Sequence, residues 1–168
     1  MPGLGAWDNT ASRLLADAER GEQILQEGNL EAAEVLCTRA LCGADGAGLA
    51  PDFRSGRLYQ LGRIKRQLSK YTEGEGLLRQ SLVIEEGLSG PDSTAVGLRL
   101  LELSLDLAGQ ERWEEGARLL ERVLPLTDRF TDKERASMAK VLKHYARQLE
   151  KTGQTGLVSR FRIAAAEL

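Results

Sequence analysis

Residues 71–82 read YTEGEGLLRQSL, and the same outline recurs as WEEGARLLERVL at residues 113–124 and as LEAAEVLCTRAL at residues 30–41. Consecutive copies begin forty-one and forty-two positions apart. A fixed period of this length is typical of chains built as a stack of helical repeats, each of which buries its apolar side against the next. The fold class that we expect is therefore all-α, an α-solenoid of about four antiparallel helix pairs.

A second helical stretch precedes each copy across a short polar corner, QEGN, SK or QER. Its apolar residues recur at spacings of three and four, which places them in one stripe along a helix. The fourth repeat continues the series, with Thr155 where the other copies have Tyr71 and Trp113. The predicted stripe consists of Leu58, Leu61, Ile64 and Leu68, then Leu100, Leu103 and Leu107, then Leu142, Tyr145 and Leu149.

We divide the chain into an N-terminal segment and a single repeat domain. The segment covers residues 1–9 and the domain covers residues 10–168. Trp7 lies in the segment, where it either caps the first helix or marks a contact site. The repeats that we expect are about 10–50, 51–90, 91–131 and 132–168.

Several residues predict how the helices begin, end and approach one another. Pro51 and Pro91 suit helix starts, and Thr131 with Glu134 has the spacing of a capping box. Pro125 should shorten or kink its helix. Small side chains recur where the two helices of a pair must touch closely, at Gly21, Gly62, Ser104 and Ala146 in the first helices and at Ala33, Gly74 and Gly116 in the second.

The net charge and the lack of long apolar runs argue against nucleic acid and membrane as partners. The chain has 168 residues and a formal net charge of -2, which provides no net cationic field for nucleic acid or for an anionic membrane surface. No apolar run approaches the roughly 20 residues that cross a bilayer, and no export signal is recognisable at the start. We therefore expect a soluble, cytoplasmic protein that binds neither nucleic acid nor membrane.

The residue types that carry chemistry are sparse. His144 is the only histidine, and it is expected on the surface or in a groove. Cys37 and Cys42 form no metal-binding or redox motif, and Cys37 falls where other repeats have a core leucine. Carboxylates lie at corners and outward helix faces, and no phosphate-binding glycine motif occurs. We expect no enzymatic activity, no metal and no cofactor.

These patterns resemble the tetratricopeptide repeat (TPR). A small residue, a Leu-Leu pair and a second small residue seven positions on recur in the second helices. The period is longer than the usual length of about 34, and Gly90-Pro91-Asp92 is followed by Thr94-Ala95. Both features are similar to the repeats of kinesin light chain and related bacterial proteins. The resemblance implies a right-handed superhelix whose first helices line a concave groove that receives peptides, without cofactor or chemistry.

Helical geometry places this groove on the face of each first helix that turns away from its own second helix. The result would be an apolar centre flanked by cations, which favours a peptide with an apolar anchor and acidic neighbours. The alternative, that the last cations form only the solvated side of a long helix, stays open. The groove candidates are Tyr59, Arg63, Arg66, Leu98, Leu101, Leu105, Lys140, Lys143 and Arg147, with Leu15, Ala18, Glu22, Gln26, Gln67 and Lys151 on the same faces.

Two functions fit the sequence. The first is a protein-interaction module, an adaptor that binds a segment of a partner protein. The second is a structural assembly unit that associates with itself through the ends of the solenoid. Phe161, Ile163 and Leu168 in the closing turns either fold back on Leu142 and Tyr145 or meet another copy, so a homo-oligomer stays open. It also stays open whether these repeats are part of a longer protein.

Overall fold

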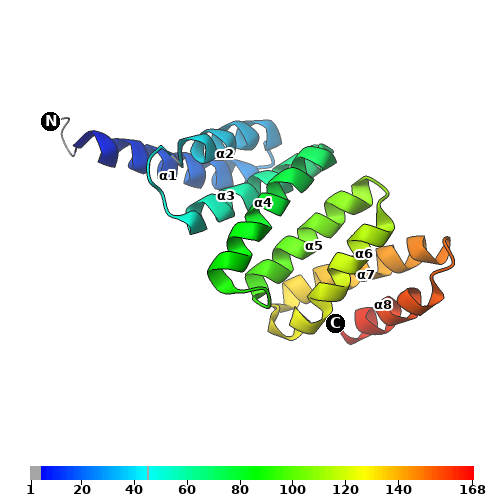
Figure 1. Ribbon diagram of the computed structural model, residues 1–168. Coiled ribbons are helices and arrows are strands. Elements are labelled where there is room, and N and C mark those ends of the chain that lie inside the picture. Colours follow the sequence, from blue (N-terminus) through cyan, green and yellow to red (C-terminus); the bar gives the residue numbers. More distant parts are fainter. Residues whose placement is uncertain (1–4, 45) are drawn as a thin grey trace. The chain divides into compact units, whose positions relative to one another are not determined.

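The computed structural model describes residues 5–44 and 46–168, with side chains from residue 10 onward. Within these ranges the chain is helical and contains no strand (Figure 1), which confirms the all-α prediction. The helices are α1 (Gly5–Gln26), α2 (Leu30–Ala44), α3 (Pro51–Gln67), α4 (Tyr71–Ser89), α5 (Thr94–Gly109), α6 (Trp113–Val123), the 3-10 helix η1 (Leu124–Arg129), α7 (Asp132–Glu150) and α8 (Thr155–Glu167).

The helices form the predicted pairs. Each second helix begins at the residue that the repeat alignment indicates, namely Leu30, Tyr71, Trp113 and Thr155. The first helix begins earlier than expected, at Gly5, so it includes residues that we assigned to a segment ahead of it. The side chain of Trp7, for which we expected a cap or a contact site, lies outside the described residues.

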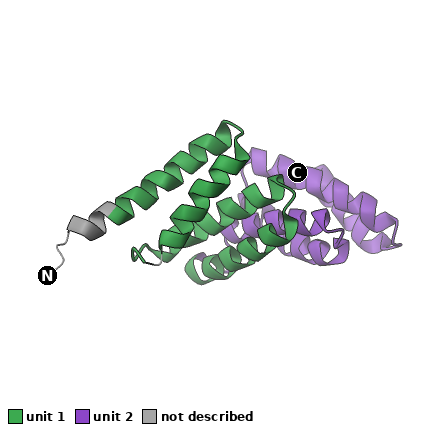
Figure 2. Ribbon diagram, turned by 90° about the horizontal axis from the view of Figure 1, so that it is seen from above, with its two compact units in different colours: residues 1–88 green, residues 89–168 purple. Residues whose placement is uncertain are grey.

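The chain divides into two compact units, residues 1–88 and 89–168 (Figure 2). Unit 1 holds the pairs α1/α2 and α3/α4, and unit 2 holds α5/α6 with η1 and α7/α8. The boundary lies at the end of the second expected repeat. Among the described residues no helix is long and apolar enough to cross a bilayer.

Unit 1 is packed through its small residues. Gly62 of α3 lies so close to α4 that a Cβ atom added to it would be 2.7 Å from Leu78 Cγ. Ala33, Cys37, Leu61 and Ile64 form a buried cluster that joins α2 to α3. The predicted stripe of α3 therefore faces the core, and the glycine allows its backbone to approach the companion helix.

Unit 2 buries the predicted stripes of α5 and α7, and Ser104 and Ala146 are fully buried between the helices. We expected Gly116 to lie where α6 touches its own first helix, α5, and the structure adds a contact with α7 at this position. A Cβ atom on Gly116 would lie 1.8 Å from the Tyr145 hydroxyl, which belongs to the following repeat. Tyr145 donates a 2.5 Å hydrogen bond to the Ser104 carbonyl. Gly116 therefore accommodates an aromatic ring that links the third repeat to the fourth.

The helices begin and end where the prolines and the capping-box pair predicted, with one exception. Pro51 begins α3, and α6 has 11 residues before Pro125, whereas α4 has 19. Thr131 and Glu134 form a complete capping box at the start of α7. The prediction for Pro91 was wrong, because α5 begins at Thr94 and the hydroxyl of Ser93 caps it by accepting from the Val96 amide.

The closing helix folds back within unit 2. Phe161 is fully buried and Leu168 is half-buried, while Ile163 is 60% exposed. α8 packs against α7. Arg160 of α8 donates to Glu121 of α6, and Arg162 of α8 donates to Glu150 of α7. The side chain of Phe161 is therefore enclosed within the chain, whereas that of Ile163 faces solvent.

Candidate peptide-binding surface

Three groove candidates lie on one face of α3. Tyr59, Arg63 and Arg66 are spaced by four and three positions, so their side chains emerge on the same side of the helix. The Arg63 guanidinium lies over the Tyr59 ring, 5.7 Å from its centroid. All three are half-buried. The cation–π contact holds a planar cation beside an aromatic surface.

Behind this face a polar network ties α3 to the preceding pair. Arg57 donates to the Gln60 side-chain oxygen at 2.7 Å and to Glu22 at 3.1 Å. The Cys37 thiol donates to the same Gln60 oxygen at 3.3 Å. Burial raises the pKa of the Cys37 thiol, which nearby Arg57 opposes. Cys37 is fully buried, as predicted, and Glu22 serves to hold Arg57.

The other α1 candidates have unequal exposure. Leu15 is 45% exposed and Gln26 is exposed, whereas Ala18 is 4% exposed. Ala18 therefore offers almost no side-chain surface to a ligand. On α3, Gln67 is exposed at the end of the helix.

In unit 2 the apolar candidates lie on α5. Leu98 and Leu105 are half-buried, and Leu101, between them along the helix, is 4% exposed. An apolar anchor from a ligand could therefore contact Leu98 and Leu105, while Leu101 contributes support from below. α5 packs against α7 within this unit.

The cationic candidates lie on α7. Lys140, Lys143 and Arg147 are all exposed, and their spacing of three and four positions places them on one face of the helix. Lys151 is also exposed, at the C-terminal end, where it donates to the Gln148 side chain at 2.8 Å. Unit 2 thus carries an apolar helix face and a cationic helix face on two elements that touch.

His144 lies in an aromatic cluster between α6 and α7. Its ring centroid is 5.3 Å from that of Trp113, which also contacts Tyr145 edge to face at 5.4 Å. The histidine is half-buried, and its ring packs against Trp113. Within the part of the chain that is described, no group of three or more His, Cys, Asp and Glu side chains could hold a metal ion.

An ion-pair cluster joins α2, α3 and α4 of unit 1. Lys65 pairs with Glu34 and with Glu73, both at 2.5 Å, and Lys70 pairs with Glu34 at 3.0 Å. The hydrogen bond from Lys65, opposed by burial and supported by Lys70, lowers the pKa of Glu34. The same pair raises the pKa of Lys65. The cluster therefore links the first repeat to the second.

Replacing Glu34 by Gln should lower the free energy of unfolding at neutral pH by about 1 kcal/mol, because it removes a largely buried partner of two lysines. A carboxyl whose pKa is lowered in the folded state stabilises above its unfolded pKa, and this contribution disappears as the pH falls through the folded value. The difference from wild type should therefore shrink in acid. Urea denaturation at several pH values, with exposed Glu19→Gln as control, measures it. A difference that is constant from neutral to acidic pH would contradict this account.

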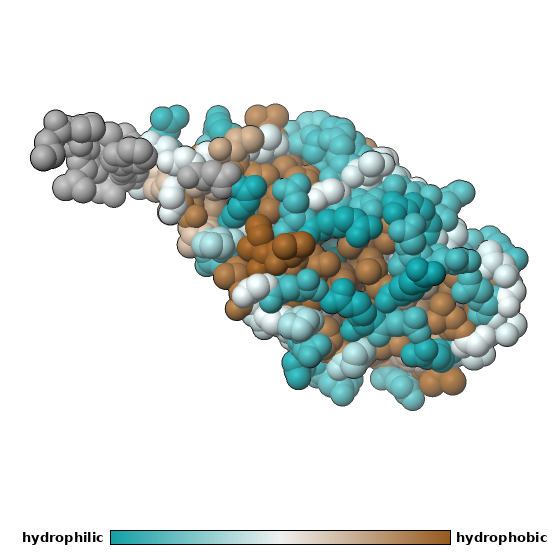
Figure 3. Space-filling view, in the orientation of Figure 1, coloured by the Kyte–Doolittle hydropathy of each residue, from teal (hydrophilic) through white to brown (hydrophobic). Residues whose placement is uncertain are grey.

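One feature of unit 1 was not anticipated from the sequence. The outer side of α4 carries an exposed apolar side chain, because Val83 is 70% exposed. Figure 3 shows a dark brown, hydrophobic area over the middle of α4. A hollow of about 380 Å³ adjoins Val83. The consecutive apolar residues Leu82, Val83 and Ile84 could have indicated this exposed side chain. Consecutive helical residues point about 100° apart, so the three cannot all reach the core.

No family model matches the chain, and no curated protein matches it. Among solved structures it is similar to BtubC (BKLC) from P. vanneervenii, with a TM-score of 0.79 and 16% identity over 92% of this chain. The chain spans 62% of the length of that structure.

A protein of Podosopora anserina assigned as a kinesin light chain, with nearly identical TPR-like repeats, gives a TM-score of 0.71 and 18% identity. It is matched over 93% of this chain and 74% of its own. A variant of that protein gives 0.69 and 20% identity, over 93% and 76%. Such similarity establishes a fold and leaves function to the surface residues. The chain has the TPR-like repeat fold that its sequence pattern predicted.

Proposed function

We propose that the chain is a protein-interaction module without enzymatic activity, an adaptor whose first helices bind a segment of a partner protein. The preferred segment carries an apolar or aromatic anchor with acidic residues beside it. The proposed setting is the cytoplasm, and neither nucleic acid, membrane nor cofactor takes part.

The arrangement in unit 2 is the observation that carries this proposal. Lys140, Lys143 and Arg147 are exposed on one face of α7, and the half-buried Leu98 and Leu105 lie on the adjoining helix α5. A desolvated apolar side chain supplies most of the affinity in such contacts, while flanking charges set specificity and association rate. An acidic segment with one apolar anchor can contact the leucines of α5 with its anchor and the cations of α7 with its carboxylates.

Unit 1 offers a second contact of the same chemistry. The Arg63 guanidinium stacked on Tyr59 is held in place by the ring, so binding a carboxylate orders fewer side-chain rotamers. The repeat fold agrees with this role, because stacked helix pairs present extended surfaces to other chains.

Reversing two charges on α7 tests the proposal. We expect Lys143→Glu with Arg147→Glu to weaken binding of an acidic peptide about tenfold or more at low salt, because two attractive charges become repulsive. The salt dependence of the remaining affinity should become flatter. The probes are fluorescent peptides with one Trp or Leu flanked by Glu and Asp, selected on a peptide array and measured by anisotropy.

Arg118→Glu with Lys133→Glu is the matched control. Both residues are exposed in unit 2, lie outside the proposed surface and change the net charge by the same amount. This control should retain the wild-type affinity. Equal weakening by both double variants would indicate a general charge effect, and unchanged affinity in the α7 variant would refute a role for these cations.

A further inference from the structure

The outer side of α4 is a second candidate surface, separate from the first-helix faces. Leu78, Ser81 and Leu82 of this helix are buried. On the opposite side of the helix, at about 100° per residue, lies a row of four exposed residues. They are Gly76, Gln80, Val83 and Gly87.

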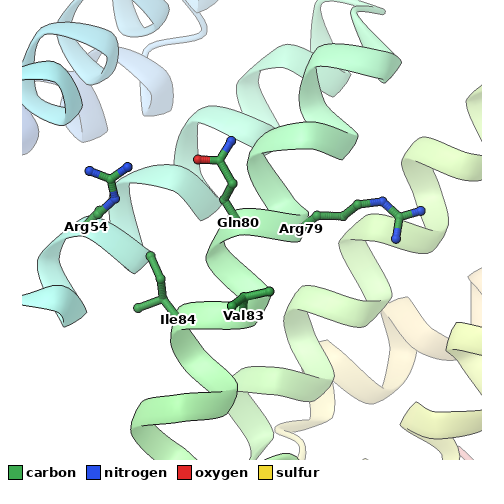
Figure 4. A pocket seen from close by; sticks show the side chains of 5 residues that line it. All are labelled: Arg54, Arg79, Gln80, Val83 and Ile84. Carbon is green, nitrogen blue, oxygen red and sulfur yellow. The ribbon is translucent and has the colours of Figure 1, made fainter.

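This face carries a protrusion and a hollow side by side. Val83 is 70% exposed, which is unusual for a branched apolar side chain. The adjoining hollow of about 380 Å³ is lined by Arg54 of α3 and by Arg79, Gln80, Val83 and Ile84 of α4. Figure 4 shows Arg54 and Ile84 toward the left and Val83 and Arg79 toward the right, with Gln80 between them. A partner must therefore present a protruding group that fills the hollow and a recess that accommodates Val83.

A second copy of the chain meets both requirements. In a two-fold symmetric contact the same patch faces itself, so the valine of each copy can enter the hollow of the other. A contact of this kind needs a patch that is complementary to itself in shape, which the pairing of Val83 with its neighbouring hollow provides.

The backbone leaves room for close approach. No atom lies within 4 Å of the position that a Cβ atom would take on Gly76 or on Gly87. Both glycines are exposed on the row that carries Val83, one about two turns before it and the other about one turn after it. Two helices can therefore come closer along this row than bulky side chains would allow.

The charges on one flank of the row are also complementary to themselves. Arg79 stands four residues before Val83, and Glu86 stands three residues after it, on the same side of the helix. When two α4 helices cross antiparallel near Val83, Arg79 of each copy comes opposite Glu86 of the other. Arg79 already pairs with Glu75 at 2.7 Å, and its side chain is still 50% exposed, so it can contact a second carboxylate.

From these observations we infer that the outer face of α4 binds a second copy of this chain, as an antiparallel α4 to α4 dimer in which the two helices cross near Val83. The area of one helix face lies at the low end for protein interfaces, so the dimer is weak and forms at high concentration. This contact does not use the first-helix surface and stands whether or not that surface binds peptides.

Sedimentation of the full chain from about 10 µM to about 1 mM tests the inference. The wild type should shift from monomer toward dimer across this range. Val83→Glu places a charge where the valine of each copy enters the hollow of the other, and it should weaken dimerisation at least tenfold. Because Val83 is exposed, the variant should retain the wild-type helical circular dichroism.

Ile163→Glu on α8 is the matched control, since Ile163 is 60% exposed and lies at the closing end of the chain. It should dimerise like the wild type. Loss of dimer with Ile163→Glu but not with Val83→Glu would assign self-association to the end of the chain and overturn the inference. A wild type that stays monomeric at every concentration would also overturn it and leave this face to a segment of another protein.

Discussion

Replacing Tyr145 with alanine is expected to lower the free energy of unfolding by roughly 3–5 kcal/mol. The side chain is fully buried, fills the space above Gly116 and donates to the Ser104 carbonyl. Truncation leaves a cavity between α5, α6 and α7 that these helices cannot close without moving. It also removes the ring against which Trp113 packs. Few single substitutions in unit 2 should cost more.

Tyr145→Phe separates packing from hydrogen bonding. It keeps the ring and removes the hydroxyl, so the expected loss is about 1 kcal/mol. Urea denaturation of both variants, followed by circular dichroism and by Trp113 fluorescence in a Trp7→Phe background, measures the two contributions. Equal losses for phenylalanine and alanine would assign the effect to the hydrogen bond. A wild-type midpoint for the alanine variant would contradict the packing described for unit 2.

Two glycines of unit 1 should respond in opposite directions to the same substitution. Gly62→Ala should destabilise by about 1–3 kcal/mol, because the new methyl group would lie 2.7 Å from Leu78 Cγ and 3.3 Å from the Gly74 carbonyl oxygen. Gly76→Ala on α4 should stabilise by up to about 1 kcal/mol, because that position is open and alanine favours a helix.

The comparison is informative because the gain in helix propensity is about the same at both positions. Only the neighbouring atoms differ. Urea denaturation of the two variants, with helix content followed by circular dichroism, gives the sign and size of each change. Stabilisation by both substitutions would show that α3 and α4 can separate without loss, and destabilisation by both would show that the outer side of α4 is packed.

The sequence was sufficient for the order and starts of the second helices. Polar corners and a fixed period place Leu30, Tyr71, Trp113 and Thr155 at equivalent positions, and each begins a helix. Pro125 ends α6 for a local reason, the missing amide hydrogen, and local chemistry of this kind is readable without tertiary structure.

Contacts between repeats were less accessible to sequence reasoning. The alignment indicated that Gly116 leaves a gap, but it did not indicate that Tyr145 of the next repeat fills it. The helical period also placed Ala18 and Leu101 on the proposed groove faces, yet both are almost fully buried, because a face defined by angle alone ignores what the neighbouring helices cover. Pro91 was misjudged because Ser93, two residues later, caps α5.

The two cysteines of α2 have opposite surroundings, and this determines where thiol reagents can act. Cys37 is enclosed, donates to Gln60 and has a raised pKa, so it carries little reactive thiolate. Cys42, five residues later, faces solvent. The native chain therefore has a single accessible attachment point for a fluorophore or spin label in unit 1, and no cysteine needs to be introduced to tag it.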